Sequence, residues 1–100
     1  MSRVVFINPA LSIKERYGIL AQAGGTEPPF GLCYLAASVM KDGHFAYIVD
    51  AQALNKGCQE TAELVLKQQP RYAAITAVSS SIHNAAAIAK KIKESDANII

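Results

Sequence analysis

The residues that decide the fold are Val4-Val5-Phe6-Ile7-Asn8-Pro9, an unbroken apolar run that ends at an asparagine and a proline. An apolar run of this kind is typical of a strand buried on both faces, as in a parallel sheet covered by helices. The strand must end at Pro9, because proline has no amide hydrogen to donate to a neighbouring strand. We therefore expect the first strand over 4–7, with a ligand site where that strand ends.

The rest of the chain alternates helices with strands, and proline, glycine or serine marks most of the boundaries. Apolar residues at three- and four-residue spacing predict the helices, and short apolar runs predict the strands. The predicted helices are one from Pro28-Pro29 to Asp42-Gly43, one over 57–69 and one after the serines at 79–81, and the later predicted strands are 45–49, 72–78 and the start of a fourth at 98–100. The inner faces are predicted as Leu32, Leu35, Ala36, Val39 and Met40, then Cys58, Ala62, Val65 and Leu66, then Ile82, Ala85, Ile88, Ala89 and Ile92.

This order of elements predicts a flavodoxin-like α/β fold, an open parallel sheet with right-handed crossovers and helices on both faces. Ligands of such sheets bind outside the carboxyl ends of the strands, where the strand order reverses. The loops at that edge are 9–27, 50–56 and 79–81. Because the sequence stops within the fourth apolar run, we expect 1–100 to be one domain, an N-terminal fragment cut after about four strands.

Composition narrows the classes of partner. The 100 residues are 51% hydrophobic and carry a net charge of +2, and the one basic cluster is Lys90, Lys91 and Lys93, which is too small to indicate nucleic acid. No apolar run approaches the ~18 residues that a membrane-spanning helix needs. Cys33 and Cys58 lie within apolar helical patterns, which predicts buried free thiols and a reducing, cytoplasmic setting.

Phosphate-binding motifs are absent from the turn after the first strand. Asn8-Pro9-Ala10-Leu11 lacks the glycines of a dinucleotide-binding turn, and the sequence has no Walker lysine motif. A phospho-receiver domain would carry an acidic residue at the end of strand three, where this chain has Val78-Ser79. The long loop over 9–27 is also unlike the short serine- and threonine-rich first loop of a flavodoxin.

The two histidines differ in their predicted positions. His44 follows Gly43 at the edge opposite the ligand site, so we predict a structural role for it. His83 lies in the first turn of the third helix, on the ligand side, where it either reaches a ligand or remains an exposed residue at the helix start. The Ser79-Ser80-Ser81 triplet beside it is better interpreted as helix capping than as a nucleophile, because no orienting acid is evident.

Three segments together resemble the N-terminal cobalamin-binding domain of radical S-adenosylmethionine enzymes, the group of the anaerobic magnesium-protoporphyrin monomethyl ester cyclases and many cobalamin-dependent methyltransferases. The segments are Val-Val-Phe-Ile-Asn-Pro (4–9), Pro-Pro-Phe-Gly-Leu-Cys-Tyr-Leu-Ala-Ala (28–37) with Asp-Gly-His (42–44) and Val-Asp-Ala (49–51), and residues 70–79 followed by Ala-Lys-Lys-Ile-Lys (89–93). The resemblance covers essentially the whole chain. Its most specific part is the Pro-Pro-x-Gly-Leu segment at this distance from Asn-Pro.

The resemblance implies cobalamin as the cofactor and a downstream radical domain of the same polypeptide as the partner. A 4Fe-4S cluster and S-adenosylmethionine would belong to that domain, because the C-x-x-x-C-x-x-C motif is absent here. The chain is therefore not expected to be catalytic by itself. The family's fourth strand runs into a Gly-Gly pair, which would lie just past Ile100.

The resemblance also implies which residues meet the cofactor. The loop over 9–27 would support the corrin ring, and a slot between strands one and three would take the nucleotide tail. The residues expected to contact cobalamin are Asn8, Pro9, Ala10, Glu27, Pro28, Thr76, Ser79, Ser80, Ser81 and His83. For the serines, capping and turn formation are equally open interpretations.

One departure from many cobalamin domains concerns the cobalt. Where those domains carry D-x-H-x-x-G after strand one, this chain has Asn8, Ala10 and Ile13. We therefore predict a base-off mode in which no histidine of the first loop ligates cobalt, and no metal ligand from the protein. The alternatives are a scaffold or interaction domain that has lost the cofactor, with a homodimer through the open fourth-strand edge, and a small-molecule sensor that uses the same cleft.

Overall fold

The computed structural model describes residues 1–10, 29–79 and 81–100 of the chain. In chain order its elements are β1 (Arg3–Asn8), α2 (Phe30–Lys41), β2 (Phe45–Asp50), α3 (Ala51–Leu54), α4 (Cys58–Lys67), β3 (Tyr72–Ile75) and α5 (Ile82–Ser95). The three strands form one sheet in the order β2-β1-β3, and both strand pairs are parallel. The predicted flavodoxin-like open parallel sheet is confirmed.

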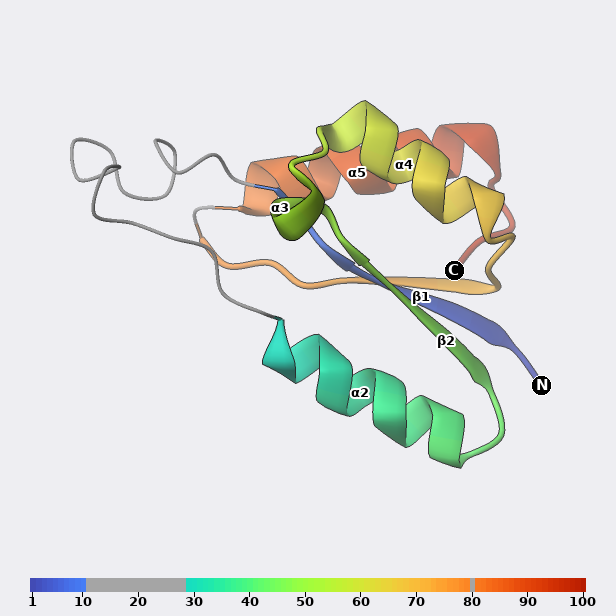
Figure 1. Cartoon of the computed structure of the whole chain (residues 1–100). Coiled ribbons are helices and arrows are strands. Elements are labelled where there is room, and N and C mark those ends of the chain that lie inside the picture. Colours follow the sequence, from blue (N-terminus) through green and yellow to red (C-terminus); the bar gives the residue numbers. More distant parts are fainter. Residues whose placement is uncertain (11–28, 80) are drawn as a thin grey trace.

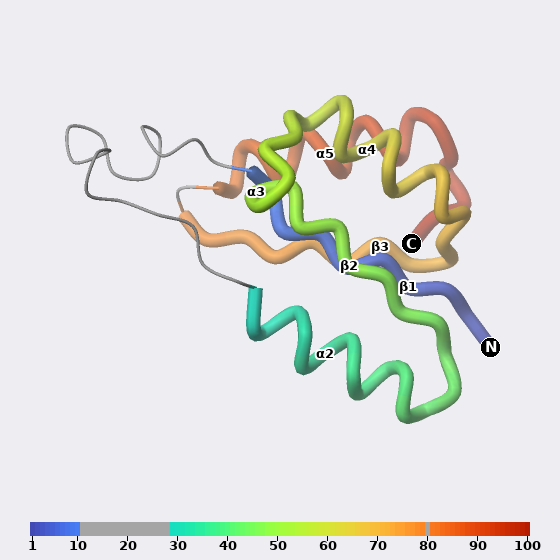
Figure 2. Tube along the Cα trace, viewed as in Figure 1, coloured from blue at the N-terminus to red at the C-terminus, as the bar shows by residue number. Residues whose placement is uncertain are grey.

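The helices form a layer on each face of the sheet. Figures 1 and 2 show α2 on one face, with α4 and α5 lying side by side on the other. Successive residues of β1 point to opposite faces, so Val5 and Ile7 pack in the α4–α5 layer while Phe6 packs against α2. All three side chains are buried, as the unbroken apolar run predicts.

The larger core lies between the sheet and the α4–α5 layer. Its buried members are Val5, Ile7, Val49, Ala62, Val65, Ile88, Ile92 and Ile99. The smaller core consists of Phe6, Leu32 and Ala36, under α2. The helix ends agree with their sequence signals: α2 begins after Pro29 and ends before Gly43, whose φ of +88° is a left-handed value that glycine adopts without strain.

Two boundaries differ from the prediction. β3 ends at Ile75 rather than Val78, and the amide of Thr76 makes the next hydrogen bond to β1, to the Ile7 carbonyl at 3.1 Å. Residues 51–54, predicted as part of a loop, form the short helix α3. Its cause is Asp50, whose carboxylate accepts a hydrogen bond from the Ala53 amide at 3.2 Å and so caps the helix.

The predicted inner faces are too wide in two helices. Leu35 and Met40 of α2 are 55% and 60% exposed, and Ile82 of α5 is 50% exposed. Cys33, predicted to be a buried thiol, is exposed as well. For α2 the reason is the width of the sheet: the helix lies mainly over β2 and β1, so its central line at Leu32, Ala36 and Val39 meets the strands and its flanks do not.

Residues 98–100 carry no strand assignment, but their backbone begins to pair with β3. The Ile100 amide donates to the Arg71 carbonyl at 3.0 Å, and the Ala73 amide donates to the Ile100 carbonyl at 2.9 Å. These two bonds lie on either side of Tyr72, which is the pattern of a parallel strand pair. Ile99 is buried against the larger core. The chain therefore approaches β3 on the side expected for a fourth strand.

The unequal burial of two isoleucines in α5 gives a test of this packing. Ile88 is 1% exposed and Ile82 is 50% exposed. We expect Ile88→Ala to lower the free energy of unfolding by about 2–5 kcal/mol, because it opens a cavity in the larger core. Ile82→Ala is the matched control and should cost less than about 1 kcal/mol. Urea denaturation followed by circular dichroism measures both, and equal losses would contradict this orientation of α5.

Candidate functional site

The strand order identifies the edge of the sheet at which a ligand site is expected, at the carboxyl ends of β1 and β3. From central β1 the chain crosses to β2 on one side and then to β3 on the other, so the order reverses between β1 and β3. Parallel α/β sheets bind ligands outside the carboxyl ends of the strands at this point. Asn8 lies at this edge on β1, and Thr76 lies beside it after β3.

The end of β1 is joined to the end of β2 by side chains. Asn8 and Asp50 are register partners, and the Asn8 amide nitrogen Nδ2 donates to Asp50 Oδ1 at 3.0 Å. The same oxygen accepts the Ala53 amide that caps α3. The Asn8 side chain is therefore held against β2, away from the β1–β3 crevice. The backbone that follows β1, rather than the Asn8 side chain, therefore faces the side of β3.

The segment after β1 is fixed by the helix layer. The Asn84 side chain at the start of α5 donates from Nδ2 to the Ala10 carbonyl at 2.9 Å, and the Cys58 thiol at the start of α4 lies 3.7 Å from the Asn84 carbonyl. A hollow of about 230 Å³ opens here. It is lined by Ala10, Asn55, Lys56, Gly57, Cys58, Asn84 and Ile88.

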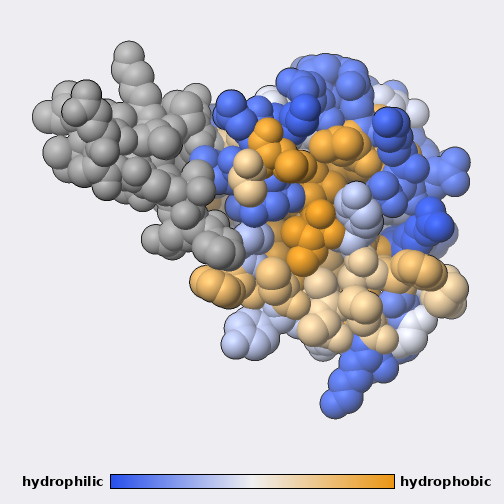
Figure 3. All heavy atoms as spheres, in the orientation of Figure 1, coloured by the Kyte–Doolittle hydropathy of each residue, from blue (hydrophilic) through white to orange (hydrophobic). Residues whose placement is uncertain are grey.

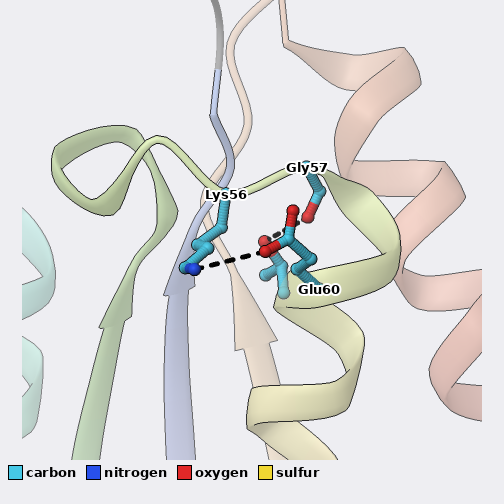
Figure 4. Close-up of polar contacts among 4 residues, drawn as sticks. Lys56, Gly57 and Glu60 are labelled. Carbon is cyan, nitrogen blue, oxygen red and sulfur yellow. Dashed lines mark hydrogen bonds and ion pairs between the residues drawn. The ribbon is translucent and has the colours of Figure 1, made fainter.

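The rim of this hollow carries a cation that already has a partner. The Lys56 ammonium lies 3.2 Å from a Glu60 carboxylate oxygen, one helical turn away, as Figure 4 shows. Close to this pair, the buried Thr61 hydroxyl donates to the Gly57 carbonyl at 2.7 Å. An exposed pair of this kind contributes at most about 0.5 kcal/mol of stability. Its main effect is to neutralise the one lysine that lines the hollow.

The exit of β3 presents small polar residues of two kinds. Thr76 and Ser79 are exposed, so their hydroxyls are open to a ligand. Ser81 is buried, and its hydroxyl forms two hydrogen bonds with the backbone of Val78. It accepts from the Val78 amide at 3.0 Å and donates to the Val78 carbonyl at 3.3 Å. Ser81 occupies the N-cap position of α5 without making the predicted side-chain cap bond. It closes the turn before α5 instead.

The histidines lie at opposite ends of the strands. His83 is exposed in the first turn of α5, near the candidate site. His44 accepts a hydrogen bond from the Ser2 amide at Nδ1, at 3.0 Å, which confirms its predicted structural role. Within residues 1–10, 29–79 and 81–100, no group of three histidine, cysteine or acidic residues is arranged to hold a metal ion. In the same residues, no helix has the length and apolar character needed to cross a membrane.

The described residues bring several predicted contacts together at the edge of β1 and β3. Asn8, Pro9, Ala10 and Thr76 lie there, with the Asn8 side chain turned toward Asp50 and Pro9 buried, and Ser79 follows as an exposed residue after β3. Glu27, Pro28 and Ser80 fall outside the described residues, as does the loop proposed to support the corrin ring except for Pro9 and Ala10. Whether any of these residues contacts cobalamin stays a prediction.

Two residues that shape this edge were missed. Asp50 could have been found, because a carboxylate at the end of β2 lies opposite Asn8 in any parallel pairing that aligns the strand ends. Asn84 gave no such signal, since its bond to Ala10 joins residues 74 positions apart. Only the docking of α5 reveals that contact.

Comparison with known proteins gives one partial match. The chain is 34% identical over 76 residues, 76% of its length, to an uncharacterized methyltransferase of Pyrococcus horikoshii. It spans 16% of that protein's length, so the match covers a small part of the relative. No protein-family model and no solved structure matches the chain. The comparison therefore shows a distant similarity to a methyltransferase.

The double role of Asp50 predicts a measurable loss of stability. Asp50→Ala removes the acceptor for both Asn8 and the Ala53 amide, and we expect it to lower the free energy of unfolding by about 1–2 kcal/mol. Asp42→Ala is the control, because Asp42 is exposed at the end of α2. Its cost should stay within about 0.5 kcal/mol in the same urea titration. Equal costs would show that the Asn8–Asp50 contact does not hold the strand ends together.

Proposed function

We propose that this chain is the cobalamin-binding part of a larger methyltransferase or cyclase of the radical S-adenosylmethionine type. The observation that carries the proposal is the reversal of strand order between β1 and β3, because such sheets bind ligands at this point, and Ala10 and Thr76, which follow the two strands, are small. The similarity to a methyltransferase supports the same class of enzyme. The radical chemistry itself is assigned to a domain outside this chain.

The described residues are compatible with the nucleotide tail of a cobalamin. Ala10 and Thr76 are small and lie at neighbouring strand ends, so neither fills the crevice. The exposed hydroxyls of Thr76 and Ser79 can each donate and accept hydrogen bonds. Asn84 fixes the backbone at Ala10, and this pre-positions the segment that a bound tail would meet. A fixed site loses less conformational entropy on binding than one that must first become ordered.

The cobalt would receive no histidine from the segment after β1. The sequence holds two histidines, and the first of them, His44, lies at the far end of β2. His83, at the start of α5, would act as a contact to the cofactor rather than as a cobalt ligand. A bound cobalamin supplies a metal that accepts and releases a methyl group. The protein's own residues would bind and orient it.

Binding is tested by titrating the purified protein with hydroxocobalamin and recording the visible spectrum. We expect saturable binding by the unmodified chain and at least a tenfold weaker affinity for Thr76→Trp, about 1.4 kcal/mol, because the indole would fill the crevice. Tyr72→Trp, at the start of β3 and so at the opposite end of the strand that Thr76 follows, is the matched control and should bind normally. No retention of cobalamin at high micromolar concentration, here or in the full-length polypeptide, would refute the proposal and favour a scaffold domain.

The predicted absence of a histidine ligand has its own spectroscopic test. In the reduced cobalt(II) state, an axial nitrogen adds a threefold splitting to the cobalt lines of the electron paramagnetic resonance spectrum, whereas an axial water does not. We expect no nitrogen splitting for the bound cofactor and no change in its spectrum for His83→Ala. A nitrogen-split signal that His83→Ala removes would show that His83 ligates the cobalt.

A further inference from the structure

The strongest feature that the site does not use is the apolar surface of α2. Its twelve residues include one charged side chain, Lys41 in the last turn. Apolar residues lie on the outward sides of the helix as well as on the inward one, and Phe30, Tyr34 and Met40 are all exposed. Helices that are apolar all round are normally covered on more than one side. In the described residues, α2 is covered on the side that faces the sheet.

Beside α2 lies the outer edge of β2, which pairs with no other strand in residues 1–10, 29–79 and 81–100. The Phe45 amide donates to the Ser2 carbonyl at 2.9 Å, so alternate residues of β2 bond to β1. The amides and carbonyls of Ala46 and Ile48 consequently point away from β1. Edge strands are usually protected by lysine, proline or a bulge, and β2 (Phe-Ala-Tyr-Ile-Val-Asp) has neither of the two residues nor an interruption in its register.

The apolar surface is continuous across these two elements. Figure 3 looks onto the β2 side of the molecule, where apolar atoms extend from α2 across the strand without a charged row between them. Phe45 and Tyr47, on the face of β2 away from α2, are 58% and 49% exposed. The helix, the strand edge and these rings therefore form one surface, which we call the β2 edge surface.

We propose that the β2 edge surface binds a second copy of this chain about a two-fold axis. Antiparallel pairing of the two β2 strands would satisfy the outward-pointing backbone groups and make one continuous six-stranded sheet. A two-fold axis normal to the sheet also sets the two α2 helices side by side on the same face. A single peptide strand at this edge would leave α2 uncovered. The proposal does not depend on cobalamin binding.

The strand is self-complementary in the register centred on Tyr47. In that register Tyr47, which is 49% exposed, lies opposite its counterpart, while Phe45 lies opposite Val49, which is already buried within its own copy. The aromatic–aromatic pair at Tyr47 contributes roughly 0.2–1 kcal/mol. Asp50 comes opposite His44 of the second copy, so no two like charges oppose each other. Lys41, at the end of α2, lies away from the axis.

The helix spacing fits the same symmetry. Strands lie about 4.8 Å apart, so a helix seated midway between β1 and β2 would lie about 10 Å from its symmetry mate. Packed helices are separated by about 8–10 Å. The side of α2 that faces this neighbour carries Cys33 and Ala37, one turn apart, which are small enough for close approach.

In this dimer the Cys33 thiol would lie next to the two-fold axis. The His44 amide bonds to the Val39 carbonyl at 3.2 Å, which sets the end of α2 level with the start of β2. Cys33 is six residues before Val39, about 9 Å along the helix, and Tyr47 is three residues after His44, about 10 Å along the strand. Cys33 is therefore level with Tyr47, and the two Cys33 side chains would face each other across the axis.

The opposite edge of the sheet is less suitable for a second copy. The backbone of Ile100 already pairs beside Tyr72, so β3 is bonded on both sides at that residue. This places the proposed contact at β2 rather than at the fourth-strand edge expected from the sequence.

Sedimentation velocity of the purified protein over a range of concentrations tests the proposal. We expect the mass of two chains for the unmodified protein and of one chain for Tyr47→Lys, because lysine on the edge strand opposes its own copy. Tyr72→Lys is the matched control, since Tyr72 is a 39% exposed tyrosine on the other outer strand, and it should remain a dimer. A protein that stays monomeric at high micromolar concentration would overturn the proposal. The proposal would also be overturned by a dimer that Tyr72→Lys dissociates and Tyr47→Lys leaves intact.

Crosslinking with a short bismaleimide locates the axis independently of any loss of folding. We expect a covalent dimer from the unmodified protein and from Cys58→Ser, and none from Cys33→Ser. Circular dichroism of each variant confirms that it is folded. A covalent dimer that needs Cys58 rather than Cys33 would place the contact on another surface and refute the arrangement.

Discussion

The burial of β1 on both faces is the constraint on which the rest of the structure depends. Because Val5 and Ile7 need the α4–α5 layer and Phe6 needs α2, the strand must lie in the centre of the sheet with a helix layer on each side. A central strand that is also first in the chain forces later strands to add on alternate sides. The order β2-β1-β3 follows, and the reversal of strand order beside β1 follows from it.

The candidate site is a consequence of that reversal rather than of any single motif. The crossover from β1 leads to α2 on one face of the sheet and the chain after β3 leads to α5 on the other, so a ligand site is expected between the carboxyl ends of these two strands. What the sequence adds is the choice of residues there. Asn8 is turned aside by Asp50, Ala10 is anchored by Asn84, and the hydroxyls of Thr76 and Ser79 remain exposed.

Prediction from sequence succeeded where one local rule decides the outcome. The apolar run before Asn8, the proline at the start of α2 and the glycine after it each fix a strand or a helix end without reference to the rest of the chain. It failed where the outcome depends on neighbours. Ile82 continues the apolar pattern of α5 but is left exposed, and Asn84 acquires its role when its helix docks beside Ala10. The contacts of Ser81 show the same limit, because a serine before a helix has two backbone targets and periodicity does not choose between them.

The same local rules explain why the sheet edges are chemically unequal. β3 follows a proline-ended helix and receives the backbone of Ile100, so its edge is used within the chain. β2 is as apolar as a central strand but, in the part of the chain that the structure describes, it pairs on one side alone, and α2 beside it is as apolar as a buried helix. If this edge made no contact, charged residues would be tolerated at positions 47 and 33, because neither Tyr47 nor Cys33 belongs to the two cores of a single chain. Their apolar character is therefore best explained by a contact that lies outside the single chain.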